Sequence, residues 1–194
     1  MTVVSNKRQQ LLDAALELLV EQGIQGAATS KIAKTAGVAT GTLFHHFHSK
    51  QELINQLYLD IKSQLAEAMT KPLLEIEDLS DLKNTTKTMW NAAIDWSIAN
   101  PLKLRFFLQF YHSPHLDSEI RAKAMNEILG FIGLLLKQGV ERGIMAEYPE
   151  DLILDLCQGQ FLSTAAFLIE NPDKAFADEY RHAAFSVFWN AIRI

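Results

Sequence analysis

Residues 27–53 read AATSKIAKTAGVATGTLFHHFHSKQEL, and this stretch decides the fold of the N-terminal part of the chain. A small residue, Ala33, stands four positions before Gly37, and the apolar residues Leu43 and Phe47 follow. Two helices that cross at a steep angle need a small side chain at their contact. The tight turn between them favours glycine, which accepts a positive φ. The pattern therefore predicts a helix-turn-helix.

The second helix of this motif, expected over residues 40–47, has one face that is not needed for packing on the first helix, residues 29–36. A short helix with small polar residues at its start suits insertion into the major groove of DNA. Glycine in the first turn lets the backbone approach closely, and threonine and histidine hydrogen-bond bases or phosphates. The residues on this outward face are Thr40, Gly41, Thr42, His45 and His46.

Residues 49–52, Ser-Lys-Gln-Glu, have the S-x-x-E form of a capping box, which predicts that a new helix starts there. Lys50 would then lie in the first turn, where the helix dipole disfavours a cation. A solvated lysine is one interpretation. An approaching phosphate, which the exposed amides of a helix start also attract, is the interpretation that we favour.

A metal site is the main alternative for the histidines. His45 and His48 are spaced i, i+3, and His112 and His115 form a second pair, but two ligands are too few for a zinc site. The sequence shows no nucleophile elbow, phosphate loop or H-E-x-x-H motif. We therefore expect no metal, no cofactor and no enzymatic activity.

The opening stretch closely resembles the DNA-binding signature of TetR-type transcriptional regulators. That signature reads roughly T-x-x-x-I-A-x-x-A-G-V-S-x-G-T-L-Y-x-H-F-x-S-K-x-x-L. The matching residues are Ile32, Ala33, Ala36, Gly37, Val38, Gly41, Thr42, Leu43, His46, Phe47, Ser49, Lys50 and Leu53.

Three positions depart from the signature. Ala28 and Ala39 stand where the family usually has the Thr and Ser that cap the two helices, and we expect Thr29 and Thr40 to cap instead. Phe44 replaces the usual tyrosine, so a hydroxyl contact to a phosphate is lost while ring packing remains possible.

The resemblance implies a role in DNA binding for several residues. Thr29, Ser30 and Lys31 would meet the DNA backbone, and Thr40, Gly41, Thr42, His45 and His46 would face the groove. Phe44 and Lys50 would rest on phosphates. Lys7 and Arg8 would add a basic arm, although solvated side chains are the alternative.

Charge and composition agree with a mildly basic N-terminal part on an acidic body. The chain of 194 residues has a net charge of −5, yet residues 1–50 carry five Lys or Arg against three Asp or Glu. An anionic partner would therefore meet the N-terminal part. Apolar runs such as residues 128–136 are too short to span a bilayer, and the start lacks a signal peptide. With a single cysteine, Cys157, we expect a cytoplasmic protein without a membrane partner.

Helical periodicity dominates the remaining sequence, and we expect about nine helices and no sheet. The chain would form an all-α protein with a helix-turn-helix DNA-binding domain at residues 1–48 and a helical effector-binding and dimerisation domain at residues 49–194. The expected helices are one ending near Gly23, then 29–36, 40–47, one from the capping box to before Pro72, 82–100, 102–111, 117–142, 150–170 and 173–193.

Aromatic residues crowd the middle helices of the body. Each of these residues could simply belong to the hydrophobic core. In regulators of the family that this chain resembles, however, the space among the middle helices holds a small, mostly apolar effector. Tyr111, Gln160 and Thr164 would supply polarity to such a site. The expected lining residues are Trp90, Trp96, Phe107, Tyr111, Met125, Leu129, Gln160, Phe161 and Thr164.

The last two predicted helices favour a homodimer. Small residues in the first of them permit close helix approach, and the final helix carries two apolar stripes that both need cover. Packing of both stripes within one chain is the alternative. The expected interface residues are Gly159, Ser163, Ala166, Tyr180, Ala184, Val187, Phe188 and Ala191.

Together these features indicate a homodimeric, TetR-like regulator, a repressor that a small apolar effector releases from a near-palindromic operator in double-stranded DNA. Two other classes remain open. One is an architectural DNA-binding protein whose body is filled, and the other is a helical small-molecule enzyme with a vestigial DNA-binding part.

Overall fold

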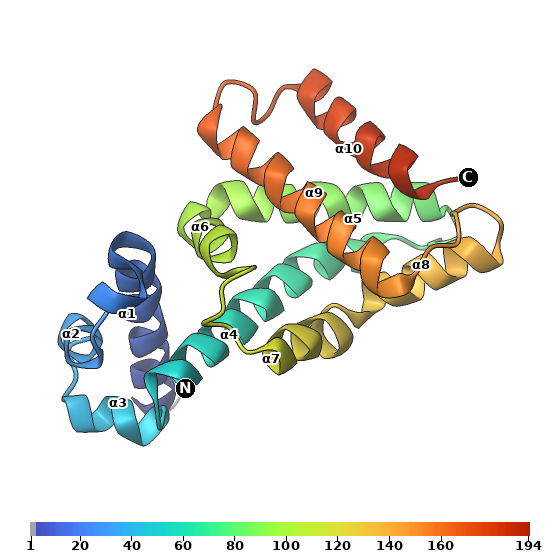
Figure 1. The fold of residues 1–194 in the computed structure, drawn as a ribbon. Helices are drawn as coiled ribbons and strands as arrows, with labels where there is room; N and C mark the ends of the chain where they lie inside the picture. The colour runs from blue at the N-terminus through green and yellow to red at the C-terminus, as the bar shows by residue number, and fades with distance from the viewer. Residues whose placement is uncertain (1–2) are drawn as a thin grey trace. The chain divides into compact units, whose positions relative to one another are not determined.

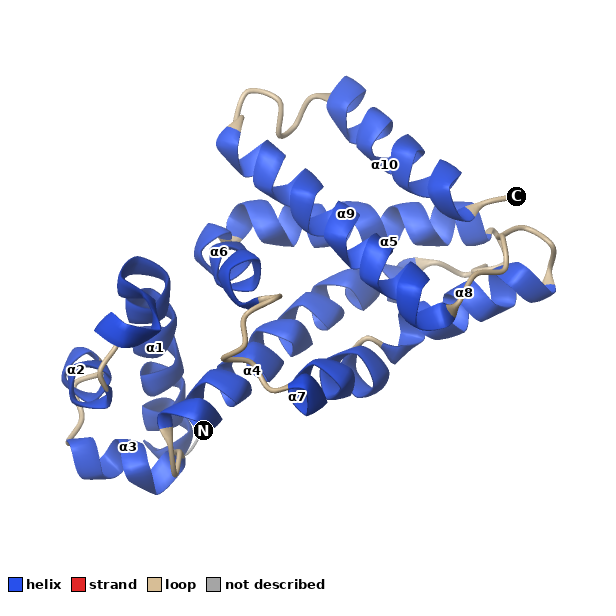
Figure 2. Cartoon of the chain, in the orientation of Figure 1, coloured by secondary structure: helices blue, strands red, loops and turns tan. Residues whose placement is uncertain are grey.

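The structure is a computed structural model in which residues 3–194 are described, with side chains from Lys7 onward. The described residues form ten α-helices and two shorter helical segments, with no β-strand (Figures 1 and 2). One isolated β-bridge joins Met145 and Arg193. The all-α prediction is therefore confirmed.

The chain packs into two compact units. The first comprises Met1–Ile61 and Arg105–Ala122, and the second comprises Lys62–Leu104 and Lys123–Ile194. The chain passes between them within three helices, α4 (Lys50–Thr70), α6 (Pro101–Phe110) and α7 (Ser118–Lys123).

The first unit is built on α1 (Val3–Gly26), α2 (Thr29–Thr35) and α3 (Thr40–His46), which pack against one another (Figure 1). Its core follows the apolar stripe of α1, of which Leu11, Leu12, Ala15 and Leu19 are fully buried. At the α4 end of this unit, Tyr58 meets the edge of Phe107 with ring centroids 5.6 Å apart.

The second unit centres on α5 (Leu82–Ala99), which packs against α9 (Glu150–Glu170) and α10 (Asp178–Ile192). The remaining elements are η1 (Lys71–Glu75), η2 (Ala124–Ile128) and α8 (Gly130–Glu141). Asp81 caps α5, since its carboxylate accepts from the Asn84 N–H at 3.0 Å.

Two helix predictions for the body are wrong in detail. Residues 117–142 do not form one helix, because η2 is a π-turn in which the Leu129 N–H donates to the Ala124 carbonyl five residues back, and Leu129 itself leaves the helix at φ −102° and ψ 11°. The last helix begins at Asp178 rather than at residue 173, because residues 171–177 form turns after Pro172.

Candidate functional site

The helix-turn-helix is held together by the residues that the sequence singled out. Ala33 on α2 and Leu43 on α3 are fully buried, and Phe47 at the end of α3 is nearly so. Between the helices Gly37 has φ +68°, a conformation that side chains rarely tolerate. The Val38 N–H donates to the Ala33 carbonyl at 3.0 Å and closes the turn.

The predicted caps of α2 and α3 are wrong. Ala28 and Ala39 occupy the cap positions without a side-chain hydrogen bond, and Thr29 and Thr40 are the first residues within the helices. A helix can start without such a cap when packing fixes it, as here.

The start of α4 does carry the predicted cap. The Glu52 N–H donates to Ser49 Oγ at 3.0 Å. The Glu52 carboxylate accepts from the His48 N–H at 2.7 Å, one residue before the usual partner in a capping box.

The outward face of α3 is open. Thr40, Gly41 and His45 are exposed, and the apolar ring of Phe44 is 45% exposed. A Cβ placed on Gly41 would meet no atom of this chain within 4 Å, so packing inside the chain does not require glycine there. Packing within the chain therefore does not account for the glycine at this position.

His46 lies beside this face with a lowered pKa. Partial burial is the main cause, and the positive charges of His45, Arg8 and Lys7 add to it. Its imidazole is therefore neutral near pH 7 and offers one donor and one acceptor. In the part of the chain that the structure describes, no three His, Cys, Asp or Glu side chains gather as a metal site.

Two lysines of the motif, Lys31 and Lys50, donate to neighbouring groups of the first unit. The Lys50 ammonium donates to the carbonyl of Ile24, which follows the kink of α1 at Gly23. Burial lowers the Lys50 pKa. Lys31 Nζ donates to Gln22 Oε1 at 2.5 Å. Lys50 thus donates inside the first unit, and its contact with a DNA phosphate stays a prediction.

Arg8 does not belong to a loose basic arm. Its guanidinium lies 5.5 Å from the centre of the Phe47 ring and donates to Gln56 Oε1 at 3.2 Å. It helps to join α1 to α4, whereas Lys7 is exposed.

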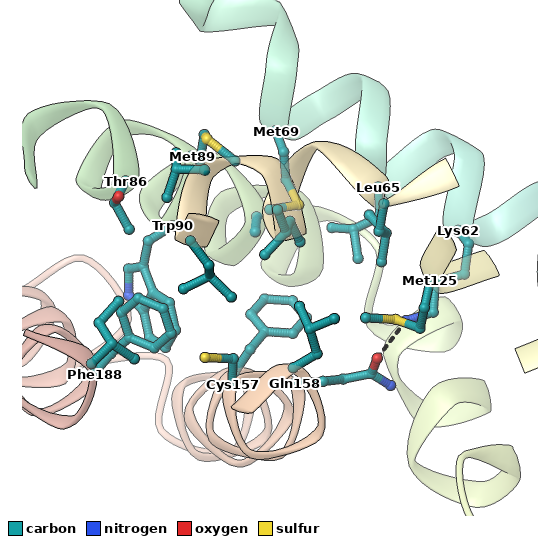
Figure 3. A pocket seen from close by; sticks show the side chains of 18 residues that line it. Lys62, Leu65, Met69, Thr86, Met89, Trp90, Met125, Cys157, Gln158 and Phe188 are labelled. Carbon is teal, nitrogen blue, oxygen red and sulfur yellow. Dashed lines mark hydrogen bonds between the residues drawn. The ribbon is translucent and has the colours of Figure 1, made fainter. Parts of the chain in front are cut away.

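The second unit contains a cavity of about 90 Å³, which we call the body cavity (Figure 3). One water needs roughly 10–15 Å³ by the same measure, so the space suits a larger guest. Four polar residues contribute to its wall, Lys62, Thr86, Cys157 and Gln158. The apolar lining is Leu65, Met69, Met89, Trp90, Ala93, Met125, Leu129, Ile132, Leu135, Leu136, Leu154, Phe161, Phe188 and Ile192.

Comparison with known proteins decides the family. The sequence model of bacterial regulatory proteins of the tetR family matches residues 11–57. The fatty acid metabolism regulator protein of Bacillus subtilis strain 168 is 30% identical over 149 residues, which cover 73% of this chain and 72% of that protein. The chain belongs to the TetR family.

Two further comparisons agree. The HTH-type transcriptional regulator BetI of Escherichia coli is 42% identical over 69 residues, 36% of this chain and 35% of that protein. A solved TetR family transcription regulator from Shewanella sp. PV-4 is 42% identical with a TM-score of 0.92, and the match covers 97% of this chain and 98% of that one. The protein is thus a DNA-binding transcriptional regulator and not an enzyme.

In this TetR family chain, four of the nine residues expected around an effector line the body cavity: Trp90, Met125, Leu129 and Phe161. The other five do not line this cavity, and their part in an effector site stays a prediction. Phe107 and Tyr111 belong to the first unit, and the remaining residues lie outside the lining, namely Trp96, Gln160 and Thr164. Trp96 instead lies under the Lys103 ammonium, 5.6 Å from its ring centre.

Sequence reasoning missed the polar residues of the cavity, above all Lys62. A lysine within a helix normally lies in water. The spacing of Lys62 could have indicated its burial. Position 62 is four residues after Tyr58 and three before Leu65, and this places it on the apolar stripe of α4.

The two apolar stripes of α10 have different environments. Phe185, Trp189 and Ile192 are buried within the chain. Phe188, which we expected at the dimer interface, is only 9% exposed, and its ring lies tilted against Trp90 with centroids 4.5 Å apart. Within the single chain it is therefore part of the core.

The other stripe of α10 joins a large apolar surface on α9, and we call the two together the α9–α10 face. Its exposed members include Leu156 at 57% and Val187 at 64%. The ring of Phe167 on α9 stacks on Tyr180 of α10 with centroids 6.2 Å apart. Expected interface residues on or beside this face are Gly159, Ser163, Ala166, Tyr180, Ala184, Val187 and Ala191, all exposed or half-buried.

Proposed function

We propose that this protein is a homodimeric repressor that binds a near-palindromic operator through α3 and is released by a small, largely apolar effector in the body cavity. The observation that carries the proposal is the open face of α3, on which Gly41 has no packing role inside the chain. The proposed DNA-binding residues are Thr29, Ser30, Lys31, Thr40, Gly41, Thr42, Phe44, His45, His46 and Lys50.

The α9–α10 face supports the homodimer. α9 is long and apolar enough to cross a membrane by length and composition, with a mean hydropathy of 1.5, and only 17% of its most apolar window is buried. A single helix of this kind is weak support for a membrane span. A second copy of the chain covers the same surface with a twofold axis and keeps the protein in the cytoplasm, which is our proposal.

The helix α4 supports the coupling between effector and DNA. Lys50 at its first turn binds the Ile24 carbonyl, while Lys62, Leu65 and Met69 further along the same helix line the body cavity. An effector that displaces this part of α4 changes the support of the DNA-binding domain, for which we propose residues 1–48. It releases the operator only if it binds the released state more tightly than the DNA-bound state.

The apolar lining supports the class of effector. Fourteen of the eighteen lining residues are apolar, and the similar protein of Bacillus subtilis is named for fatty acid metabolism. An architectural DNA-binding protein with a filled body is less well supported, because the cavity is open to a guest.

Selection from random duplex DNA at about physiological salt tests the proposal. We expect enrichment of a near-palindrome whose half-sites are about one helical turn apart, since a twofold dimer presents two copies of α3. Absence of enrichment after the protein has been unfolded and refolded to remove bound ligand would refute the DNA-binding proposal.

Two variants then test the residue roles on the selected site. His45→Ala is expected to relax base preference, whereas Lys50→Ala is expected to weaken all sequences alike and to flatten the salt dependence by about one. Because Lys50 also binds Ile24, the helical content of both variants is compared by circular dichroism. Identical behaviour of the two variants contradicts the assignment.

A further inference from the structure

The wall of the body cavity contains a buried cationic side chain. Lys62 is 2% exposed, and its ammonium donates to Gln158 Oε1 at 3.2 Å (Figure 3). Among the described residues that line the cavity, no other is basic and none carries a carboxylate. Among these lining residues, Lys62 is therefore the one place where the wall can carry a positive charge.

The two other polar lining groups are already accounted for. The Thr86 hydroxyl donates to the Leu82 carbonyl in its own helix at 2.6 Å. Burial raises the pKa of the Cys157 thiol to about 11, so the thiol is neutral at physiological pH. Figure 3 shows Lys62 and Gln158 at one end of the cavity and Trp90 and Phe188 at the other, together with Thr86, whose hydroxyl is bonded within its own helix.

The polar end is complementary to an anion. Burial lowers the pKa of Lys62 to about 7, and an adjacent negative charge restores the charged form of such a group. The amide of Gln158 has N–H donors besides the oxygen that accepts from Lys62, so the two residues together match a group with two acceptor oxygens. A carboxylate is the simplest such group.

We propose that the body cavity binds an amphiphilic organic acid. Its carboxylate lies between Lys62 and Gln158, and its apolar chain extends toward Trp90 and Phe188. The inference rests on the proposed function in taking this cavity as the effector site, but binding of the acid requires no DNA.

The methionines that line the cavity affect how selective it is for the length of the ligand's apolar chain. Met69, Met89 and Met125 line the cavity, and their flexible side chains adapt to guests of different shape. Selectivity is therefore strict for the head group and loose for the length of the chain.

Isothermal titration calorimetry with the full-length protein tests this, with hexanoate, octanoate and decanoate as probes. Each acid is paired with the primary alcohol of the same length, which keeps the chain and removes the charge. We expect each wild-type affinity for an acid to exceed that for its alcohol by at least tenfold. Lys62→Met, which keeps the side-chain length, is expected to abolish this preference.

Two more variants keep the test decisive. Gln158→Leu retains the ammonium and is expected to reduce the preference three- to tenfold, even if Lys62→Met folds poorly. Lys87→Met removes an exposed lysine from the same unit and is expected to leave the preference unchanged. Equal binding of acids and alcohols by the wild type, absence of binding by all three acids, or an unaltered preference in both cavity variants overturns the proposal.

Measuring operator binding in the presence of the acids distinguishes this inference from the proposed function. Lys62-dependent binding of decanoate that leaves the selected operator bound supports the acid site and contradicts release by this ligand. If the protein binds the operator but none of the three acids, the proposed role in DNA binding stands and the acid site is refuted.

Discussion

Replacing Lys62 by methionine is expected to stabilise the ligand-free protein at pH 7. Burial lowers the pKa of Lys62 from 10.5 to about 7, and each pKa unit corresponds to 1.36 kcal/mol, so the buried amine costs about 4 kcal/mol at neutral pH. Methionine removes this cost but also a hydrogen bond worth about 1 kcal/mol, and leaving the Gln158 amide unpaired costs about 1–2 kcal/mol. The net gain in the free energy of unfolding is about 1–2 kcal/mol.

The pH dependence gives the sharper part of this prediction. The unfolded lysine keeps its proton up to about pH 10.5, whereas the folded one loses it near pH 7, so between these values the unfolded state binds more protons. Wild-type stability therefore rises with pH through this window and falls as the pH drops toward 7. The rise from pH 7 to pH 9 is about 2 kcal/mol for this group, and Lys62→Met lacks it.

Urea unfolding followed by circular dichroism at pH 7 and pH 9 measures both quantities. Protein concentration is held constant, because the proposed dimerisation would add a concentration-dependent contribution to stability. Lys87→Met serves as the control and is expected to follow the wild type at both pH values. The reasoning fails if Lys62→Met is less stable than the wild type at pH 7, or if its advantage does not shrink by pH 9.

The structure also predicts the outcome of three substitutions and the reactivity of one cysteine. Gly41→Ala is expected to stabilise the fold by about 0.5–1 kcal/mol, because alanine is the better helix former and its Cβ meets open space, yet to weaken operator binding in a mobility-shift assay; unchanged binding contradicts the DNA contact. Gly37→Ala, at φ +68°, is expected to cost about 1–2 kcal/mol in thermal unfolding, and a neutral result would show that the turn is not strained. Cys157 is expected to react with iodoacetamide about 100-fold more slowly than glutathione at pH 7.5, by mass spectrometry, because its pKa is about 11; comparable rates would mean that the thiol is not buried. Leu156→Glu is expected to convert the protein to monomers in sedimentation velocity, and a persistent dimer would place the interface elsewhere.

The helix-turn-helix could be predicted from the sequence because its determinants are local. Ala33, Gly37 and Leu43 act through sterics within a span of eleven residues, and no distant part of the chain has to be known. The predicted caps at Thr29 and Thr40 are one residue too late, because Ala28 and Ala39 occupy the cap positions. Packing, rather than a side-chain hydroxyl, fixes where these helices start.

The cavity could be predicted only in part, because its lining depends on which side of each helix faces inward. Trp90 and Trp96 are both large and aromatic and lie on the same helix, yet only Trp90 turns toward α9 and α10. The break at Leu129 also depends on a π-turn that helical periodicity does not reveal. Pairwise packing of distant segments decides these points, and residue type alone does not.

The α9–α10 face also determines how the cell must supply this protein. Leu156 and Phe167 are exposed in the single chain. In the proposed homodimer a second copy would cover them, and its association would be second order in protein concentration. Halving the copy number then reduces the population of pairs by more than half whenever the monomer predominates. On our proposal of a homodimeric repressor, the protein would respond to its own synthesis rate as well as to its effector, and its abundance would partly set how steeply transcription responds.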